Sequence, residues 1–161
     1  MLLTLKPIFV VVNCDEEKIN DTFSFPDNVE SVNISIKTEQ EIQQLNEQEK
    51  KDFLQLLGLK ESPSNRLIKF AYNFGGLISF ITACPKEIHS WTIKRGTTAY
   101  DAADTIHSDI KKGFIRAEVI HFDNLKLAGS EAEAKKMGFY SLKGKDYIVN
   151  DGDVIYFRFN V

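Results

Sequence analysis

The sequence predicts an α/β segment followed by an α+β unit, and three observations indicate this division. Pro7–Val12 is almost wholly apolar and β-branched, which is typical of a strand covered on both faces of a parallel sheet. The succession of strand-like and helix-like segments changes near residue 75. The charge balance changes there too, because residues 1–75 hold 8 Lys and Arg against 12 Asp and Glu, whereas residues 76–161 hold 12 against 11. The Gly75-Gly76 pair is therefore the expected hinge between units 1–75 and 76–161.

The composition is that of a chain with a packed core and no membrane span. The 161 residues are 43% hydrophobic and 27% charged, enough for one domain or two small ones. The net charge of −3 gives no general reason to expect nucleic-acid binding. Apolar runs such as IFVVV are too short to cross a bilayer, and MLLTLKP lacks the features of a signal peptide. Cys14 and Cys84 form neither a metal spacing nor a disulfide framework, so we expect a reducing, cytoplasmic compartment.

The first unit is expected to contain two strands followed by helices. Val32–Ile36 alternates as a short strand does, and Glu39–Leu57 has the apolar spacing of one or two amphipathic helices that end at Gly58. Asp21–Asn28 is expected to be a loop, and Ser62-Pro63-Ser64 is a suitable helix start. About 75 residues supply too few neighbours to cover a parallel sheet, so this segment is predicted to be part of one.

The second unit is expected to fold as an α+β domain that resembles ubiquitin. The predicted elements are strands over 77–83 and 88–94, a helix capped by Thr97 or Thr98, a strand over Phe114–Phe122, a short turn or helix at Asp123-Asn124, a helix capped by Ser130, and strands over Lys145–Val149 and Val154–Asn160. Asn150–Asp153 is a turn of the Asn, Asp and Gly type. Two strands, a helix and further strands match a ubiquitin-like β-grasp, whose size allows independent folding.

Asn13-Cys14-Asp15-Glu16 follows the first strand and has the form of a loop that reads a nucleotide base. A carboxamide can donate and accept hydrogen bonds at once, as the edge of a purine requires. An asparagine after a strand more often simply forms a turn. Cys14 has no histidine that can be placed beside it as a catalytic partner. His89, His107 and His121 show no ligand spacing, so surface or core roles are expected for them.

From Leu3 to Val161 the chain resembles the C-terminal half of the Obg-like ATPase family, also called YchF. The matching stretches are KPIFVVVNCDE, NISIKTEQEI, LLGL, LISFITACPKEIHSWTIKRGTTAYDAADTIHSDIKKGFIRAEVIHFDNL and LKGKDYIVNDGDVIYFRFNV. The resemblance implies that residues 1–75 are an incomplete C-terminal segment of a P-loop GTPase-like sheet. It implies that residues 76–161 are the family's TGS domain, a β-grasp module.

The resemblance also gives the Asn13 loop a role. Related GTPases read guanine with Asn-Lys-x-Asp, whereas this family carries Asn-x-x-Glu and is thought to favour ATP over GTP. The base-reading residues implied here are Asn13, Cys14 and Glu16, together with Ser35 and Ile36 of the next loop, Ser35-Ile36-Lys37. The family usually has a small residue where this chain has Ile36.

The phosphate-binding half of such a site needs Gly, four spacer residues and then Gly-Lys-Ser/Thr. The nearest string is GFYSLKGKD over 138–146, whose glycines are one residue too far apart and whose Asp146 replaces the hydroxyl. Base contacts alone contribute only about 0.5–1.5 kcal/mol each. We therefore predict that ATP is held weakly or not at all by these 161 residues alone, that they do not hydrolyse it, and that Mg²⁺ binds only if a partner supplies the phosphate loop.

A second candidate function is contact with RNA or the ribosome through the TGS-like unit. The cations expected to form a basic face are Lys94, Arg95, Lys111, Lys112 and Arg116. Such residues are usually solvated surface, but the family's association with ribosomes supports a contact. Three hypotheses stay open: a truncated relative that keeps its TGS interaction module, half of an enzyme completed by a separate chain, and a free-standing RNA- or ribosome-binding module.

Overall fold

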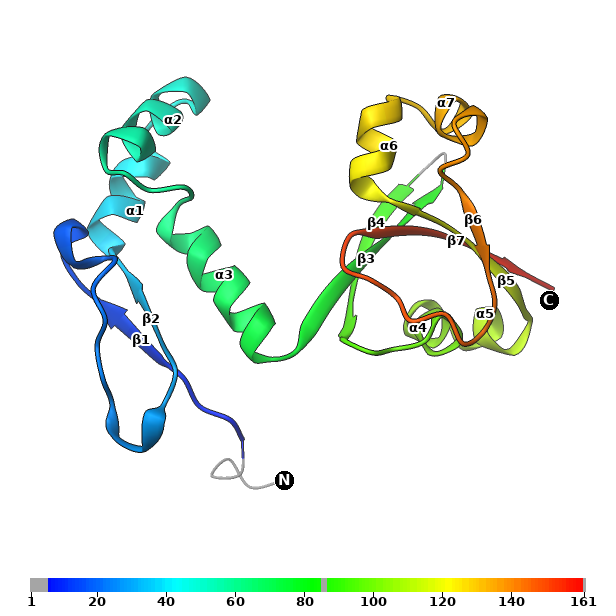
Figure 1. Ribbon diagram of the computed structural model, residues 1–161, viewed down its shortest axis with the longest axis horizontal. Coiled ribbons are helices and arrows are strands. Elements are labelled where there is room, and N and C mark those ends of the chain that lie inside the picture. The colour runs from blue at the N-terminus through cyan, green and yellow to red at the C-terminus, as the bar shows by residue number, and fades with distance from the viewer. Residues whose placement is uncertain (1–5, 85–86, 161) are drawn as a thin grey trace. The chain divides into compact units, whose positions relative to one another are not determined.

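The computed structural model describes residues 6–84 and 87–160. The chain divides into two compact units, Met1–Tyr72 and Asn73–Val161 (Figure 1). The division falls three positions before the boundary between residues 75 and 76 that the charge and the element order indicate. In the described ranges, no helix is both long and apolar enough to cross a membrane.

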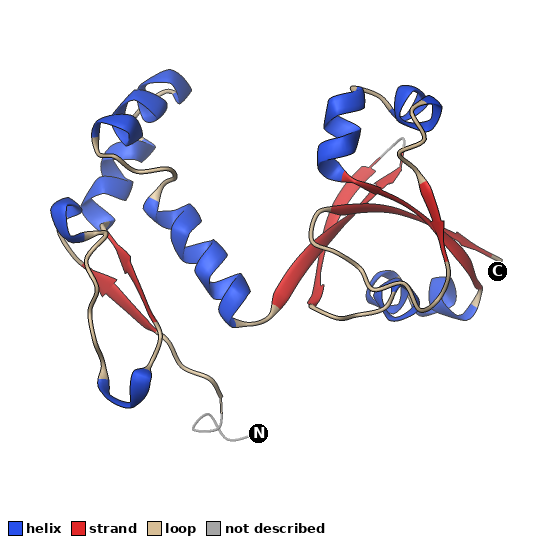
Figure 2. Cartoon of the chain, in the orientation of Figure 1, coloured by secondary structure: helices blue, strands red, loops and turns tan. Residues whose placement is uncertain are grey.

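The first unit has the predicted order of two strands followed by helices (Figure 2). Strands β1 (Val10–Asn13) and β2 (Ser31–Ile34) pair in parallel, from Val10 opposite Ser31 to Asn13 opposite Ile34. The connection contains two short 3-10 helices, η2 (Glu16–Lys18) and η3 (Pro26–Asn28). The helices are α1 (Ile36–Gln43), α2 (Glu47–Leu56) and α3 (Pro63–Phe74). The parallel pairing brings the carboxyl ends of both strands to one edge of the unit.

The second strand ends before its predicted limit at Ile36, because Ser35 caps a helix instead of continuing the strand. Ser35 is only 2% exposed, and its Oγ accepts hydrogen bonds from the Thr38 backbone N–H at 3.3 Å and the Thr38 hydroxyl at 2.9 Å. An N-cap of this kind satisfies a backbone donor that the first helical turn leaves open. Ile36 therefore opens α1.

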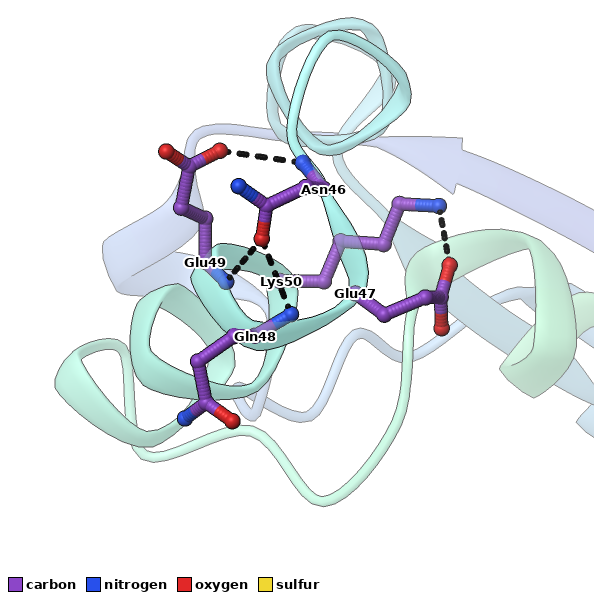
Figure 3. Close-up of polar contacts among 5 residues, drawn as sticks. All are labelled: Asn46, Glu47, Gln48, Glu49 and Lys50. Carbon is purple, nitrogen blue, oxygen red and sulfur yellow. Dashed lines mark hydrogen bonds and ion pairs between the residues drawn. The ribbon is translucent and has the colours of Figure 1, made fainter.

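A capping box explains why Glu39–Leu57 forms two helices (Figure 3). The Asn46 Oδ1 accepts hydrogen bonds from the Gln48 and Glu49 backbone N–H groups at 3.0 Å each. In return, the Asn46 N–H donates to the Glu49 carboxylate at 3.0 Å. The reciprocal bonds start α2 at a fixed residue. Gly58, at φ +65°, ends it as predicted, since this conformation favours glycine.

The second unit is built on a five-stranded sheet with the strand order β4-β3-β7-β5-β6. The elements are β3 (Leu77–Cys84), β4 (Glu87–Lys94), α4 (Ala99–Ile106), α5 (Ser108–Lys112), β5 (Phe114–His121), α6 (Phe122–Ala128), α7 (Glu131–Lys136), β6 (Ser141–Lys143) and β7 (Asp153–Phe159). β3 and β7 run parallel, and the other neighbouring pairs are antiparallel. The first and last strands of the unit thus lie side by side inside the sheet.

The main core lies between the sheet and α4. Its buried members come from the sheet, from α4 and from the segment before β7: Ile78, Phe80, Ile93, Ala99, Ala102, Ala103, Phe114, Ala117, Val119, Val149 and Ile155. Three alanines on α4 let the helix backbone approach the sheet closely. A smaller cluster of Ile120, Val154 and the α7 residue Ala134 lies on the other face, with Leu125 and Ala128 of α6 packed against it.

The predicted strand over Lys145–Val149 is wrong. The fourth strand is instead Ser141–Lys143, which pairs with β5. The Tyr147 carbonyl accepts from the Ala99 N–H at 2.7 Å, and the Val149 N–H donates to the Thr97 carbonyl at 3.0 Å. The backbone of this segment therefore forms hydrogen bonds with the residues at the start of α4 and just before it, around a single antiparallel bridge between Thr98 and Ile148. β7 pairs with β5 and β3, so the Asn150–Asp153 turn does not join two paired strands.

Candidate functional site

The carboxyl end of β1 and the start of α1 meet at Asn13. The Asn13 Oδ1 accepts a hydrogen bond from the Ile36 backbone N–H at 3.2 Å. This contact joins the two loops that the sequence marks as base-reading loops, although they are separated by 23 positions. With Oδ1 occupied, the exposed Asn13 side chain presents its Nδ2 group as a hydrogen-bond donor.

An open cavity of about 240 Å³ lies between the two loops. Its lining residues are Asp15, Glu16, Glu17, Ser35 and Lys37. Three carboxylates and one ammonium group make the wall predominantly acidic. The Ser35 hydroxyl already contacts Thr38, so its side chain serves the helix cap. The sequence prediction named Glu16 and Ser35 but passed over Asp15, Glu17 and Lys37, which lie within or next to the same motifs.

The Cys14 side chain and backbone both contact the end of β2. Its Sγ donates to the Ile34 carbonyl at 3.6 Å, and its backbone N–H donates to the same carbonyl at 2.9 Å. Burial raises the pKa of the Cys14 thiol, and the negative charges of Asp15 and Asp21 raise it further. A thiol in this setting stays protonated near neutral pH and is a poor nucleophile.

Two of the five predicted RNA-contacting cations are held in ion pairs. Lys111 lies 3.1 Å from the carboxylates of both Asp101 and Asp104. Hydrogen bonds to these two groups raise the pKa of Lys111. Lys112 lies 3.7 Å from Asp109. Both lysines are at the carboxyl end of α5, where positive charge also suits the helix dipole.

Lys94, Arg95 and Arg116 are exposed, and within the described ranges none of them has an ion pair. Lys94 follows the buried Ile93, and Arg116 precedes the buried Ala117, so Lys94 and Arg116 lie on the sheet face opposite the main core. Two strands separate them, which corresponds to about 14 Å across the sheet. The structure therefore does not gather all five cations into one basic face.

His107 and His121 begin helices. Each Nδ1 accepts a hydrogen bond from a backbone N–H two residues later, Asp109 at 3.2 Å and Asp123 at 3.3 Å. An Nδ1 that accepts is unprotonated, so neutral imidazole is the capping form. His89 lies 2.9 Å from Glu87. Among the residues that the structure describes, no group of His, Cys, Asp or Glu could hold a metal ion.

The sequence of the second unit matches a known protein family. The family model YchF-GTPase_C, described as "Protein of unknown function (DUF933)", matches residues 77–160, more than half of the chain. The chain belongs to the YchF family. A YchF relative in Bacillus subtilis (strain 168), named "Ribosome-binding ATPase YchF", is 42% identical over 171 residues, which cover 99% of this chain and 47% of the relative. A relative of the same name in Haemophilus ducreyi (strain 35000HP / ATCC 700724) is 43% identical over 168 residues, covering 99% and 46%.

Solved structures agree with this family assignment. The Schizosaccharomyces pombe YchF GTPase aligns with a TM-score of 0.76 and 28% identity, covering 98% of this chain and 44% of that one. A GTP-binding protein from Pyrococcus horikoshii OT3 aligns at 17% identity with a TM-score of 0.53, which shows likeness of fold alone. The chain spans about half the length of the YchF relatives it matches and corresponds to their C-terminal part.

Proposed function

We propose that this YchF chain supplies the base-reading part of a purine nucleotide site, with a TGS-like unit attached. The observation that carries the proposal is the hydrogen bond from the Ile36 N–H to Asn13 Oδ1. It fixes the carboxamide and leaves Nδ2 to donate to the N7 acceptor that every purine presents. The Glu16 carboxylate, which lines the cavity between the two loops, is an acceptor suited to the exocyclic amino group of adenine, in agreement with the ATPase names of the relatives.

The described residues fit the base but not the triphosphate or its Mg²⁺. Asp15, Glu16 and Glu17 line the cavity, and their charges repel phosphate oxygens. Most of the binding free energy of a nucleoside triphosphate comes from charge-assisted contacts to the phosphates and the metal. We therefore propose that the phosphate loop and the Mg²⁺ ligands come from outside these 161 residues, either from a preceding part of the same polypeptide or from a separate chain.

Calorimetry with ATP and Mg²⁺ tests this proposal. The 161-residue chain alone is expected to bind more weakly than about millimolar, because a few neutral hydrogen bonds are all it offers. Addition of a YchF segment that carries the phosphate loop is expected to restore micromolar binding and hydrolysis. A micromolar constant for the 161 residues alone, with contaminating ATPases excluded, contradicts the proposal.

A second function, docking on ribosomal RNA, is supported by the names of the relatives and by the second unit. The relatives are named ribosome-binding ATPases. The order β4-β3-β7-β5-β6, with β3 and β7 parallel in the interior, is that of a β-grasp sheet, which supports the TGS assignment. We place the RNA contact on Lys94, Arg95 and Arg116, because Lys111 and Lys112 already contact carboxylates.

RNA binding measured against salt concentration tests the second function. Replacing Lys94 and Arg95 by alanine is expected to weaken binding to ribosomal RNA and reduce the salt slope by about 2. The matched control replaces Lys111 and Lys112, which removes the same formal charge from the ion-paired sites. An equal loss in both double variants would show that net charge alone drives binding, and the placement would be wrong.

A further inference from the structure

Two arginines lie opposite each other on interior strands of the second unit's sheet. Arg116 of β5 is paired in register with Arg158 of β7, and both strands have a neighbour on each side in the order β4-β3-β7-β5-β6 (Figure 1). Like charges at directly opposed positions destabilise an antiparallel pair, because their side chains start only about 5 Å apart. Charges that protect a sheet from unwanted pairing belong on its edge strands, so edge protection does not explain this pair.

A β-bulge directs Arg116 to this position. The register of β5 against β7 shifts between Phe114 and Arg116. Phe114 and Ala117 are both buried in the main core, and the extra residue between them turns Arg116 toward the opposite face of the sheet. Arg158 reaches the same face because it follows Phe157, which packs against the main core. Bulges are frequent next to functional sites, where they re-aim a side chain.

The two guanidinium groups differ in their partners. Arg158 donates from Nε to Glu118 Oε1 at 2.9 Å and from Nη2 to Glu118 Oε2 at 3.2 Å. This two-pronged contact holds the Arg158 guanidinium in one orientation and leaves its Nη1 group over. Arg116 is exposed, and no carboxylate in the described part of the chain forms an ion pair with it. The surface therefore offers one complete guanidinium fork and part of a second, side by side.

Positive charge predominates around this pair. The pKa of the Glu118 carboxyl is lowered, chiefly by its hydrogen bond to Arg158. The charges of Arg158, Lys135 and Arg116 lower this pKa further, so three cations surround one carboxylate. Glu131 of α7 is a second carboxylate on this side of the sheet, and it accepts a hydrogen bond from a tyrosine hydroxyl of β7. The excess of positive charge, together with unused N–H donors, favours an oxyanion.

We propose that Arg116 and Arg158 together bind a phosphate group, whose oxygens bridge the two guanidinium groups. Phosphate presents several acceptor oxygens, and a guanidinium plane binds two of them at once. A phosphate between the two arginines also removes the repulsion that their register creates. The phosphate belongs either to an RNA backbone or to free phosphate. The RNA source deepens the second proposed function and rests on it, whereas binding of free phosphate does not depend on it.

Titration of the 161-residue chain with inorganic phosphate tests the site. Phosphate replaces chloride at constant ionic strength and pH, and the backbone amide signals are followed by NMR. We expect saturable shifts centred on Arg116 and Arg158, with a dissociation constant of about 1 mM. Arg116→Gln, an exposed change that preserves the fold, is expected to weaken binding by about tenfold or more.

Lys112→Gln is the matched control for charge. It removes one positive charge from α5, which packs on the core side of the sheet, and it is expected to bind phosphate as the original chain does. Equal weakening in Arg116→Gln and Lys112→Gln would show a response to net charge alone and would overturn the proposal. Shifts that do not saturate in the original chain would overturn it too.

Glu118→Gln provides a test of the opposite sign. The change releases the Arg158 fork and removes the nearest negative charge, so phosphate affinity is expected to rise by about tenfold. If the arginines served only to stabilise the sheet through Glu118, this variant would not bind phosphate more tightly. Unchanged or weaker phosphate binding in Glu118→Gln therefore contradicts the proposal.

Competition distinguishes the two sources of the phosphate group. A ribosomal RNA oligonucleotide without a terminal phosphate is added to the chain already saturated with inorganic phosphate. Displacement of the bound phosphate supports the site and assigns it to the RNA backbone, whereas retention supports the site and assigns it to free phosphate. Because the first titration contains no RNA, a failure of RNA docking and a failure of this phosphate site give separate results.

Discussion

The Tyr147 hydroxyl donates a 2.8 Å hydrogen bond to the Asp153 carboxylate, which is only 3% exposed. The same Oδ2 accepts the Asn150 N–H at 2.9 Å, and the Asn150 side chain donates back to the Tyr147 oxygen at 2.9 Å. This closed set of bonds fixes the turn that leads into β7, the strand that links the two halves of the sheet.

Loss of the Tyr147 hydroxyl should destabilise the second unit. Tyr147→Phe leaves the buried Asp153 carboxylate short of a donor, so we expect the free energy of unfolding to fall by about 1–3 kcal/mol. Urea unfolding followed by Trp91 fluorescence measures the change. Tyr100→Phe is the control, because its hydroxyl has no hydrogen-bond partner in the described ranges. Equal effects from both variants would contradict the prediction.

Alkaline pH should act through the same hydroxyl. Burial, followed by the hydrogen bond to Asp153, raises the pKa of Tyr147 to about 12 from an ordinary value of 10.0. Between these values the unfolded chain has lost the Tyr147 proton while the folded chain keeps it. This contribution to stability is therefore complete below pH 10 and declines as pH rises toward 12. Unfolding midpoints measured across this range should fall less steeply in Tyr147→Phe than in the original chain.

The capping box should govern the stability of the first unit. Asn46→Ala leaves the Gln48 and Glu49 N–H groups without their acceptor, and we expect a loss of about 0.5–2 kcal/mol. Circular dichroism during urea unfolding measures it. Gln55→Ala, an exposed change on the same helix, should have little effect. A comparable loss of stability in Gln55→Ala would show that the effect comes from any change in the helix and not from the cap.

Aspartate at position 13 should separate folding from base reading. Asn13→Asp keeps an oxygen for the Ile36 N–H but loses the Nδ2 donor. We expect an unchanged melting temperature and about tenfold weaker ATP binding once a phosphate-loop segment has been added. Asn13→Leu should lose both properties. Full ATP affinity in Asn13→Asp would show that this side chain does not read the base.

Close packing should forbid a side chain at Gly113. A Cβ there would overlap the backbone oxygen of Asn160, whose N–H donates to the Gly113 carbonyl at 3.0 Å. Because a backbone neighbour cannot move aside easily, Gly113→Ala should cost about 2 kcal/mol or more of stability. Gly144→Ala, with open space around its Cβ position, is the matched control. Thermal unfolding that is equal in both variants would disprove this account.

Local patterns predicted most of the elements, and the failures arose where a side chain or a distant segment decided the outcome. The alternating apolar pattern predicted a strand through Ile36. The strand ends at Ile34 instead, because Ser35 caps α1. α5 was missed because its cap is His107, which is outside the usual capping residues. The strand-like Lys145–Val149 instead bonds to the segment where α4 begins, and this choice depends on contacts about 50 positions away in the sequence.

Sequence motifs named two loops of the candidate site, but not how their side chains contact one another. The motifs identified the Asn13 loop and the Ser35 loop, which parallel pairing of β1 and β2 then brings together. They did not foresee that the Asn13 oxygen is already used by Ile36. Nor could they show that Lys111 is engaged by two aspartates, since the three residues meet only when α5 folds back beside α4.

The position of β7 also has a consequence during synthesis. This strand lies between β3 and β5, so before it is made the sheet consists of separate antiparallel pairs with two unfilled inner edges. A ribosome-bound nascent chain cannot complete the domain until Asp153–Phe159 has left the exit tunnel. Until β7 is added, the unpaired inner edges of β3 and β5 are exposed, and such edges favour aggregation.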